Sequence, residues 1–172
     1  MKNFFIFAFL CLKLNLLQAQ TNAEFFAKLS PAGSFTGATK AVTGFAIVDG
    51  DKVSASNIEV DLTKLTTGLE LRDKHTQDHL ETSKYPKAKL ITAQGVAGKG
   101  TGEIEIKGIK KSIEGTYSVK NNFLTAEFNL NLPDFNIKGI RYMGVGLKDN
   151  INLKVTIPVN SATVKPTSPP NK

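Results

Sequence analysis

Hydrophobic and polar residues alternate along most of the chain. In residues 58–62, Ile58, Val60 and Leu62 alternate with acidic residues. The same period of two recurs over residues 103–107, 112–119, 124–130 and 151–157. A period of two is typical of a β-strand with one buried face. Less regular apolar segments predict further strands over residues 24–29, 41–48 and 88–94. The sequence therefore predicts an all-β fold with about eight strands.

Turn-forming residues separate these segments at short intervals. They are Asp49-Gly50-Asp51, Gly98-Lys99-Gly100, Gly108 and Asn121-Asn122. Such spacings are typical of antiparallel hairpins, whereas a parallel sheet would need helical crossovers. An up-and-down barrel and a sandwich both satisfy this pattern. The last strand should end at Pro158, because proline cannot donate a hydrogen bond to a sheet.

One segment lacks the alternation and predicts a short helix around residues 71–82. Asp73 is a plausible N-cap, and Leu80 should face inward. Pro86 disfavours the helical conformation at Tyr85, so the helix should end before it. A second irregular stretch, rich in glycine, places Tyr142 and Met143 on a loop before the last strand.

The first twenty residues predict a secretory signal peptide. Lys2 precedes the apolar run 4–12, and the segment ends near the small residue Ala19. The run is too short to span a membrane, so we expect no integral span after its removal. The only cysteine, Cys11, is removed with it. We therefore expect a periplasmic or secreted protein that packing alone holds together.

Residues 21–160 are enough for one domain, and the Pro-rich residues 161–172 predict a disordered tail. The formal net charge of the 172 residues is +7, but lysines of the leader and the tail contribute part of it. The remaining positive charge is too small and too dispersed to indicate nucleic-acid binding.

Few residues suggest catalysis. His75 and His79 would share one face of the predicted helix, but two ligands do not make a metal site, and the HExxH pattern is absent. We expect no metal and no cofactor. No Gly-x-Ser-x-Gly elbow occurs. An enzyme that acts on a lipid headgroup with His75 or His79 as the base is a weaker alternative, and we predict that the protein is not an enzyme.

Several motifs, in order, resemble the YceI-like family. They are Asp61-Leu62-Thr63-Lys64-Leu65-Thr66-Thr67-Gly68, Arg72-Asp73-Lys74-His75, Glu81-Thr82-Ser83-Lys84-Tyr85-Pro86, Asp134-Phe135-Asn136-Ile137 and Gly146-Leu147-Lys148-Asp149. The resemblance covers about residues 21–160. It implies an eight-stranded antiparallel barrel, lipocalin-like, that holds a long-chain polyisoprenoid or another apolar lipid for transport, storage or sequestration. Whether the barrel acts alone or as a homodimer stays open.

The apolar strand positions and nearby aromatic residues are the candidate lining of a lipid channel. They are Phe45, Ile58, Val60, Leu80, Tyr85, Ile104, Ile106, Tyr117, Phe128, Leu130, Phe135, Ile137, Tyr142, Met143, Ile151 and Leu153. Arg72, Asp73 and His75 are candidates for a polar mouth or for a structural role. The same apolar stripes would equally suit a packed core, as in an envelope domain that has a structural or partner-binding role and holds no ligand.

Overall fold

The structure, a computed structural model, describes residues 21–161. The predicted signal peptide and residues 162–172 of the predicted tail lie outside the described residues, as do the side chains of Tyr142 and Ser161. The strands are β1 (Asn22–Ser30), β2 (Ser34–Thr39), β3 (Val42–Thr43), β4 (Ala46–Asp49), β5 (Lys52–Asp61), β6 (Lys87–Val96), β7 (Lys99–Ile106), β8 (Ile109–Lys120), β9 (Phe123–Asn131), β10 (Arg141–Tyr142) and β11 (Val145–Ser161). The helices are α1 (Glu70–Leu80) and the 3-10 turns η1 (Leu62–Lys64) and η2 (Leu132–Phe135).

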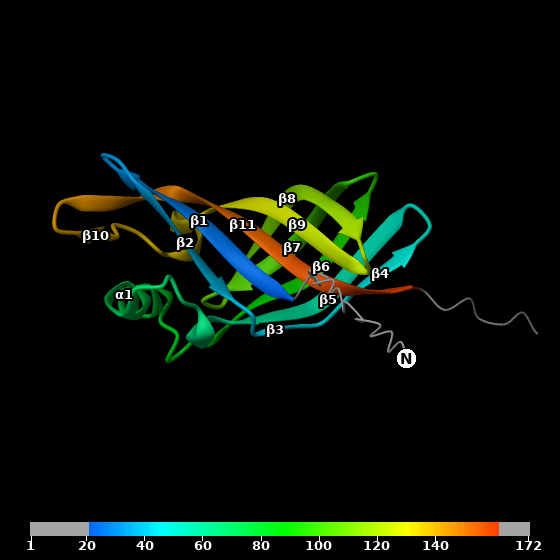
Figure 1. Ribbon diagram of the computed structural model, residues 1–172, viewed down its shortest axis with the longest axis horizontal. Helices are drawn as coiled ribbons and strands as arrows, with labels where there is room; N and C mark the ends of the chain where they lie inside the picture. Colours follow the sequence, from blue (N-terminus) through cyan, green and yellow to red (C-terminus); the bar gives the residue numbers. More distant parts are fainter. Residues whose placement is uncertain (1–20, 162–172) are drawn as a thin grey trace, which may run out of the picture.

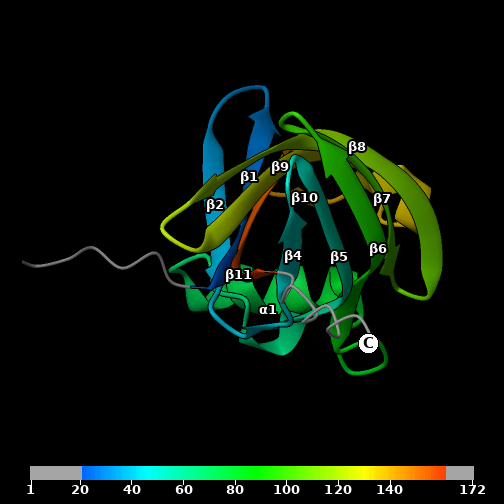
Figure 2. The ribbon, with the colours of Figure 1, turned by 90° about the vertical axis from the view of Figure 1, so that its right-hand side faces the viewer.

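The long strand β11 closes the sheet into a barrel. One edge of β11 pairs with β9 over residues 150–158. Its other edge pairs first with β1 and then, over residues 159–161, with β4. Strands β4 to β9 continue the ring as consecutive antiparallel neighbours. The strands surround one axis in the end-on view (Figure 2). The predicted all-β, lipocalin-like barrel is confirmed.

The strand count and the strand directions differ from the prediction of eight antiparallel strands. Seven strands form the closed ring, and β1, β2, β3 and β10 are additional. The pairing of β4 with β11 is parallel. The predicted strand 41–48 is split into β3 and β4 at Gly44, whose φ of +108° a side chain would disfavour. Strand β2 was not predicted, because Ser34–Thr39 contains only one large apolar residue, Phe35.

The hairpin turns form where the sequence predicts them. The loops Ala97-Gly98, Lys107-Gly108 and Asn121-Asn122 each connect paired strands and have positive φ at both residues. Two such residues in succession make a type I′ turn, whose twist matches that of antiparallel strands. The Gly98–Gly102 stretch is therefore part of a hairpin.

The expectation that Pro158 ends the last strand is wrong. Strand β11 continues to Ser161, and Pro158 lies opposite Phe123 of β9. The next residue, Val159, pairs with Ala46 of β4. The strand therefore continues past its proline, because its other edge finds a new partner there.

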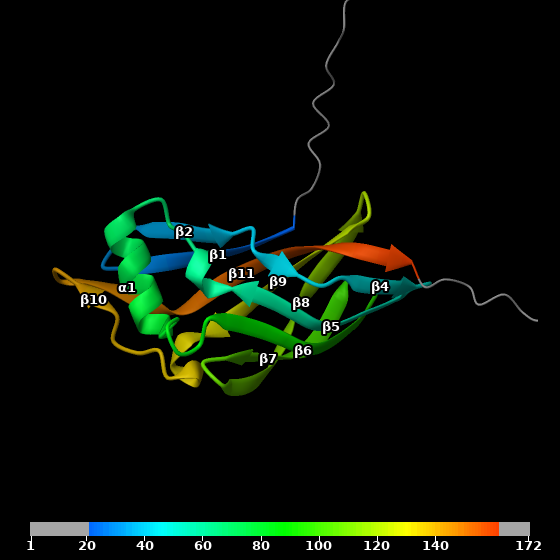
Figure 3. The ribbon, with the colours of Figure 1, turned by 90° about the horizontal axis from the view of Figure 1, so that it is seen from below.

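The predicted helix is confirmed, although its N-cap is not Asp73. Helix α1 begins at Glu70 after Leu69, which makes no side-chain capping bond. It ends at Leu80, and the C-cap residue Glu81 has the left-handed conformation. It lies with β10 at one end of the barrel, and the β4–β5 hairpin lies at the other (Figures 1 and 3). None of its residues is buried. Hydrophobic burial therefore contributes little to holding it.

Polar contacts hold the first turn of α1. The Asp73 carboxylate accepts hydrogen bonds from the Thr67 backbone N–H at 2.6 Å and from the hydroxyl groups of Thr66 and Thr67. Thr66 also pairs with Ala38 of β2 through two backbone hydrogen bonds. The hydrogen bonds from Thr67 and Thr66 lower the pKa of Asp73. Asp73 thus connects the helix to the wall, as a structural role predicts.

An ion pair with the Lys107 side chain holds the C-terminal end of α1. The Lys107 ammonium contacts the Glu81 carboxylate at 2.6 Å and donates to the His79 carbonyl oxygen at 3.3 Å. The Lys107 side chain is only 9% exposed. Its hydrogen bond lowers the pKa of Glu81. The β7–β8 turn thereby fixes the end of the helix to the barrel.

The buried apolar residues form two clusters. One comprises Ala23, Val42, Ala46, Ile58, Leu124 and Ile157. The other comprises Ile104, Leu130, Leu132, Phe135 and Ile137. The second cluster includes η2, whose Phe135 is 1% exposed. Because η2 carries Leu132 and Phe135 against the barrel strands, it packs one end of the interior.

Replacing Phe135 by alanine should destabilise the barrel strongly. Removing a fully buried phenylalanine costs about 3–5 kcal/mol, through lost burial and the void left behind. Phe45, which is 46% exposed, is the matched control, and Phe45→Ala should cost less than about 1 kcal/mol. Urea unfolding followed by circular dichroism measures both. Equal losses of unfolding free energy in Phe135→Ala and Phe45→Ala would show that Phe135 is not part of the packed core.

Asp73→Asn should destabilise the protein at neutral pH by about 1 kcal/mol, since hydrogen bonds to a charge are partly screened at a solvent-accessible site. The pKa of Asp73 is lowered in the folded state. Its contribution is therefore complete above the ordinary carboxyl pKa of about 4 and is lost as the pH falls below it. Urea midpoints at pH 7 and pH 3 measure the effect.

The difference between wild type and Asp73→Asn should shrink at pH 3. Asp78→Asn is the control, because it makes the same change at an exposed position of α1. A difference that is the same at both pH values would show that the Asp73 carboxylate does not hold the helix.

Candidate functional site

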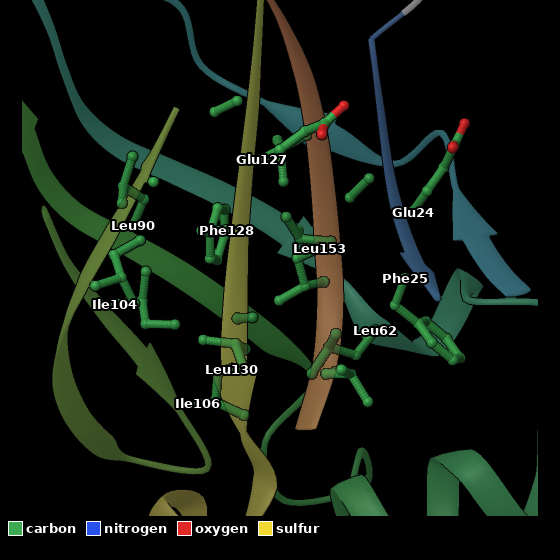
Figure 4. A pocket seen from close by; sticks show the side chains of 18 of the residues that line it. Glu24, Phe25, Leu62, Leu90, Ile104, Ile106, Glu127, Phe128, Leu130 and Leu153 are labelled. Atoms are coloured by element: carbon green, nitrogen blue, oxygen red, sulfur yellow. The ribbon is translucent and has the colours of Figure 1, made fainter. Parts of the chain in front are cut away.

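The barrel encloses a cavity of about 680 Å³ (Figure 4). Its wall comes from the inward-facing positions of β5 to β9 and β11, together with residues of β1, β2, α1 and the segment around β10. The cavity is lined by many of the predicted channel residues: Ile58, Val60, Leu80, Ile104, Ile106, Tyr117, Phe128, Leu130, Ile137, Met143, Ile151 and Leu153. The period of two therefore identifies the cavity wall from the sequence on most strands.

Small residues at inward positions explain why the barrel is hollow. Strand β6 carries Ala88 and Ala93 on the cavity side, and β7 carries Gly100 and Gly102. A Cβ atom on Gly102 would approach the Thr92 carbonyl oxygen to 2.7 Å, so the neighbouring backbones need a glycine there. An eight-stranded barrel is about wide enough for its side chains to fill, and this closed ring has only seven strands, so the open space depends on the small side chains on one wall.

The cavity is apolar despite acidic residues in its wall. Figure 4 shows the carboxylates of Glu24 and Glu127 pointing away from the apolar side chains. Glu127 alternates along β9 with Ala126 and Phe128, so its side chain faces outward. Lys89 likewise reaches outward, to Glu59 at 3.5 Å. The strands therefore bring hydrocarbon, and not charge, into the cavity.

Three predicted channel residues do not line the cavity. Phe45 is 46% exposed, because Val42 and Ala46 occupy the buried positions of its segment. Phe135 is buried in the second apolar cluster. Tyr85 contacts Lys84, whose ammonium lies 5.0 Å from its ring centre. The side chain of Tyr142 lies outside the described residues.

Sequence reasoning missed residues of β1 and β2 that line the cavity. Phe25 and Leu29 lie on β1, and Phe35 lies on β2. The rings of Phe25 and Phe35 meet edge to face at 5.7 Å between centroids. The sequence could have identified the residues of β1, because a period of two places Phe25, Ala27 and Leu29 on one face of the strand.

Of the three predicted polar residues, Arg72 and His75 line the cavity and Asp73 does not. The Arg72 guanidinium lies 4.4 Å from the centre of the Phe35 ring. It also donates hydrogen bonds to the hydroxyl oxygen of Thr67 at 3.0 Å and to its carbonyl oxygen at 3.1 Å. Arg72 therefore connects α1 to the aromatic part of the cavity wall.

The cavity opens beside α1. Leu69 and Leu71 line it and are more than half exposed, and Met143, also in its wall, is 86% exposed. Large apolar side chains that lie both in a cavity wall and in solvent mark its rim. Helix α1 and the β10–β11 turn thus form the mouth.

Within residues 21–161, no cluster of three or more histidine, cysteine, aspartate or glutamate side chains could hold a metal ion. In the same part of the chain, no helix is long and apolar enough to cross a membrane.

Solved structures share this fold at low sequence identity. BcnA of Burkholderia cenocepacia matches with a TM-score of 0.62 and 18% identity, over 79% of this chain and 94% of that one. A polyisoprenoid-binding domain from Saccharophagus degradans, implicated in plant cell wall breakdown, matches with a TM-score of 0.55 and 13% identity, over 79% and 91%. The YceI protein of Campylobacter jejuni matches with a TM-score of 0.50 and 19% identity, over 70% and 81%.

No curated protein matches the sequence. The family model of the YceI-like domain matches residues 14–159. This match spans the barrel from β1 to residue 159 of the closing strand β11 and includes α1. The chain therefore belongs to the YceI-like family.

Proposed function

We propose that the protein binds a long-chain polyisoprenoid or a similar amphiphile in its barrel cavity. One observation carries the proposal: an apolar cavity of about 680 Å³ inside the barrel, with exposed apolar residues beside α1 in its wall. Ligand sites in proteins occupy about 300–1,000 Å³, so the volume suits a lipid tail. The structural relative from Saccharophagus degradans is described as a polyisoprenoid-binding domain, which supports the same ligand class.

The cavity can accommodate a chain of useful length. A water-sized group occupies about 30 Å³, so the cavity holds at least about 20 carbon atoms. Each buried methylene yields about 0.8 kcal/mol, or about 4 kcal/mol gross for a five-carbon unit, before the cost of ordering the chain. Affinity should therefore rise with tail length until the cavity is filled.

The cavity favours this proposal over a structural domain with a packed core. A packed core leaves few voids larger than a water molecule, whereas this barrel keeps small residues on one wall and open space beside them. The alternative of a partner-binding envelope domain gives no reason for that space. Binding without a catalytic step fits the hydrocarbon side chains that the strands turn inward.

Export fits the sequence of residues 1–20, and we propose that the protein works in the periplasm or after secretion. In such a compartment it would transport, store or sequester its lipid.

Protein purified without detergent should release a stoichiometric apolar lipid on extraction with organic solvent. Mass spectrometry of the extract identifies the lipid and its chain length. A control extraction of a similarly expressed protein without a cavity defines the background. An empty extract, together with no uptake of added polyprenyl chains, would overturn the proposal.

Ala93→Phe should reduce lipid uptake at least tenfold, because the new ring would project into the cavity from β6. Thr92→Phe is the matched control. It adds the same ring at the preceding residue of β6, which is exposed and does not line the cavity. Titration with a fluorescent polyprenyl probe measures both variants. Equal loss in the two variants would show that the probe does not bind inside the barrel.

A further inference from the structure

Large apolar side chains are exposed at the end of the barrel where α1 lies. Leu69, Leu71 and Met143 are each more than half exposed, and Val145 is exposed as well. They come from two separate segments, the start of α1 and the β10–β11 turn, which lie at the same end of the barrel (Figures 1 and 3). Single exposed leucines are ordinary in proteins, but large apolar residues from two segments at one end form a patch. We call these four residues the apolar rim.

Neither burial nor turn chemistry explains the side chain of Met143. The residues on either side of the β10–β11 turn pair with each other, so Met143 and Gly144 form a two-residue turn with positive φ at both positions. Such type I′ turns favour asparagine, aspartate and glycine, because other side chains disfavour the left-handed conformation. Met143 is 86% exposed, so packing within the chain does not offset this preference. A large apolar side chain at the tip of the hairpin therefore points to a contact outside the chain.

The charges beside the β10–β11 turn are mainly positive. Between the end of η2 and residue 149, the charged side chains are Lys138, Arg141, Lys148 and Asp149, and all of them are exposed. Arg141 lies beside the turn, since it pairs with Gly146. The first residues of α1 carry two acidic and two basic side chains: Glu70, Arg72, Asp73 and Lys74. The α1 side of the rim is therefore neutral, and the net positive charge lies on the β10–β11 side.

An anionic lipid bilayer fits both features of this end. Its headgroup layer is negative and its acyl chains lie directly beneath, so apolar tips flanked by basic residues are complementary to it. The rim consists of a projecting hairpin turn and the start of a helix, and such separate tips can enter a headgroup layer (Figures 1 and 3). A second copy of the chain would instead bring Arg141 and Lys148 against residues of like charge, which disfavours self-association through this face.

We propose that this end of the barrel docks on an anionic bilayer. Leu69, Leu71 and Met143 then lie at the boundary between headgroups and acyl chains, and Arg141 and Lys148 lie near the lipid phosphates. Docking in this orientation places the opening of the cavity against the membrane surface. The inference goes beyond the proposed function and does not rest on it, because the rim is exposed whatever the cavity holds.

Vesicle flotation tests the docking. The chain from residue 21 is used, because the apolar run of residues 4–12 would bind vesicles by itself and every strand of the barrel lies after it. A basic residue near an anionic surface contributes about fivefold to binding, so vesicles of phosphatidylcholine and phosphatidylglycerol at about 3:1 should bind at least tenfold more protein than phosphatidylcholine alone. The absence of binding to the anionic vesicles would overturn the proposal.

The double variant Leu69→Gln/Met143→Gln should lower the partition coefficient on anionic vesicles at least tenfold, because two large apolar side chains no longer insert. Val96→Gln/Val119→Gln is the matched control. It makes the same kind of change at exposed positions beside the β6–β7 and β8–β9 turns, and it should bind as the wild type does.

A fluorescent label reports the insertion directly. Cys11 is the only cysteine, so the chain from residue 21 offers no competing thiol. An environment-sensitive fluorophore on Met143→Cys should shift its emission to the blue when anionic vesicles are added, whereas the same label on Val96→Cys should not. A shift of equal size at both positions would overturn the assignment of the rim.

The outcomes separate docking from its alternatives and from the proposed function. Vesicle binding that Leu69→Gln/Met143→Gln leaves unchanged would overturn the docking face. A dimer that this variant dissociates, seen by sedimentation velocity in a protein that binds no vesicles, would overturn docking in favour of self-association. Uptake of polyprenyl chains without vesicle binding would overturn docking alone, and vesicle binding by a protein that takes up no lipid would overturn the proposed function alone.

Discussion

Closure of the sheet by β11 is the constraint on which the rest of the structure depends. Its residues 150–158 are paired on one edge by β9, while the other edge is occupied first by β1 and then by β4. Both edges of this strand are therefore satisfied, and no open edge remains there. A ring closed in this way has an inside, and the alternation of side chains decides what fills it.

Side chains fill the interior of the barrel unevenly, because large and small residues lie on different parts of its wall. Large residues such as Ile104, Leu130 and Phe135 pack into one cluster, whereas other inward positions of β6 and β7 hold only alanine or glycine. The free energy that these large residues gain by burial offsets the contacts that the open wall forgoes. The barrel can therefore be stable although part of its interior is an open cavity.

The sequence predicts most of the cavity wall, because period two is a local property of each strand. The prediction from period two fails where the position of a residue depends on turns or on contacts with distant parts of the chain. Phe45 has the size of a cavity residue, but the neighbouring Ala46 takes the buried position, and the chain bends at Gly44, where a side chain would collide with Ile58. Phe135 belongs to a 3-10 turn that no alternation describes. The parallel pairing of β4 with β11 joins segments more than a hundred residues apart, and it depends on how the whole ring closes.

The two ends of the barrel differ, and this difference gives the cavity a direction. At the end away from α1, the type I′ hairpins Ala97-Gly98 and Asn121-Asn122 join ring strands tightly. At the other, α1 has no buried residue and is held by a few polar contacts, so opening it breaks fewer bonds than parting two strands would. The same end carries Arg72 and the exposed residues Leu71 and Met143. An amphiphile that entered there tail first would leave its headgroup at the mouth in water, whereas the reverse orientation would bury the headgroup among hydrocarbon without partners. Burial of the tail and retention of the headgroup therefore favour the same orientation.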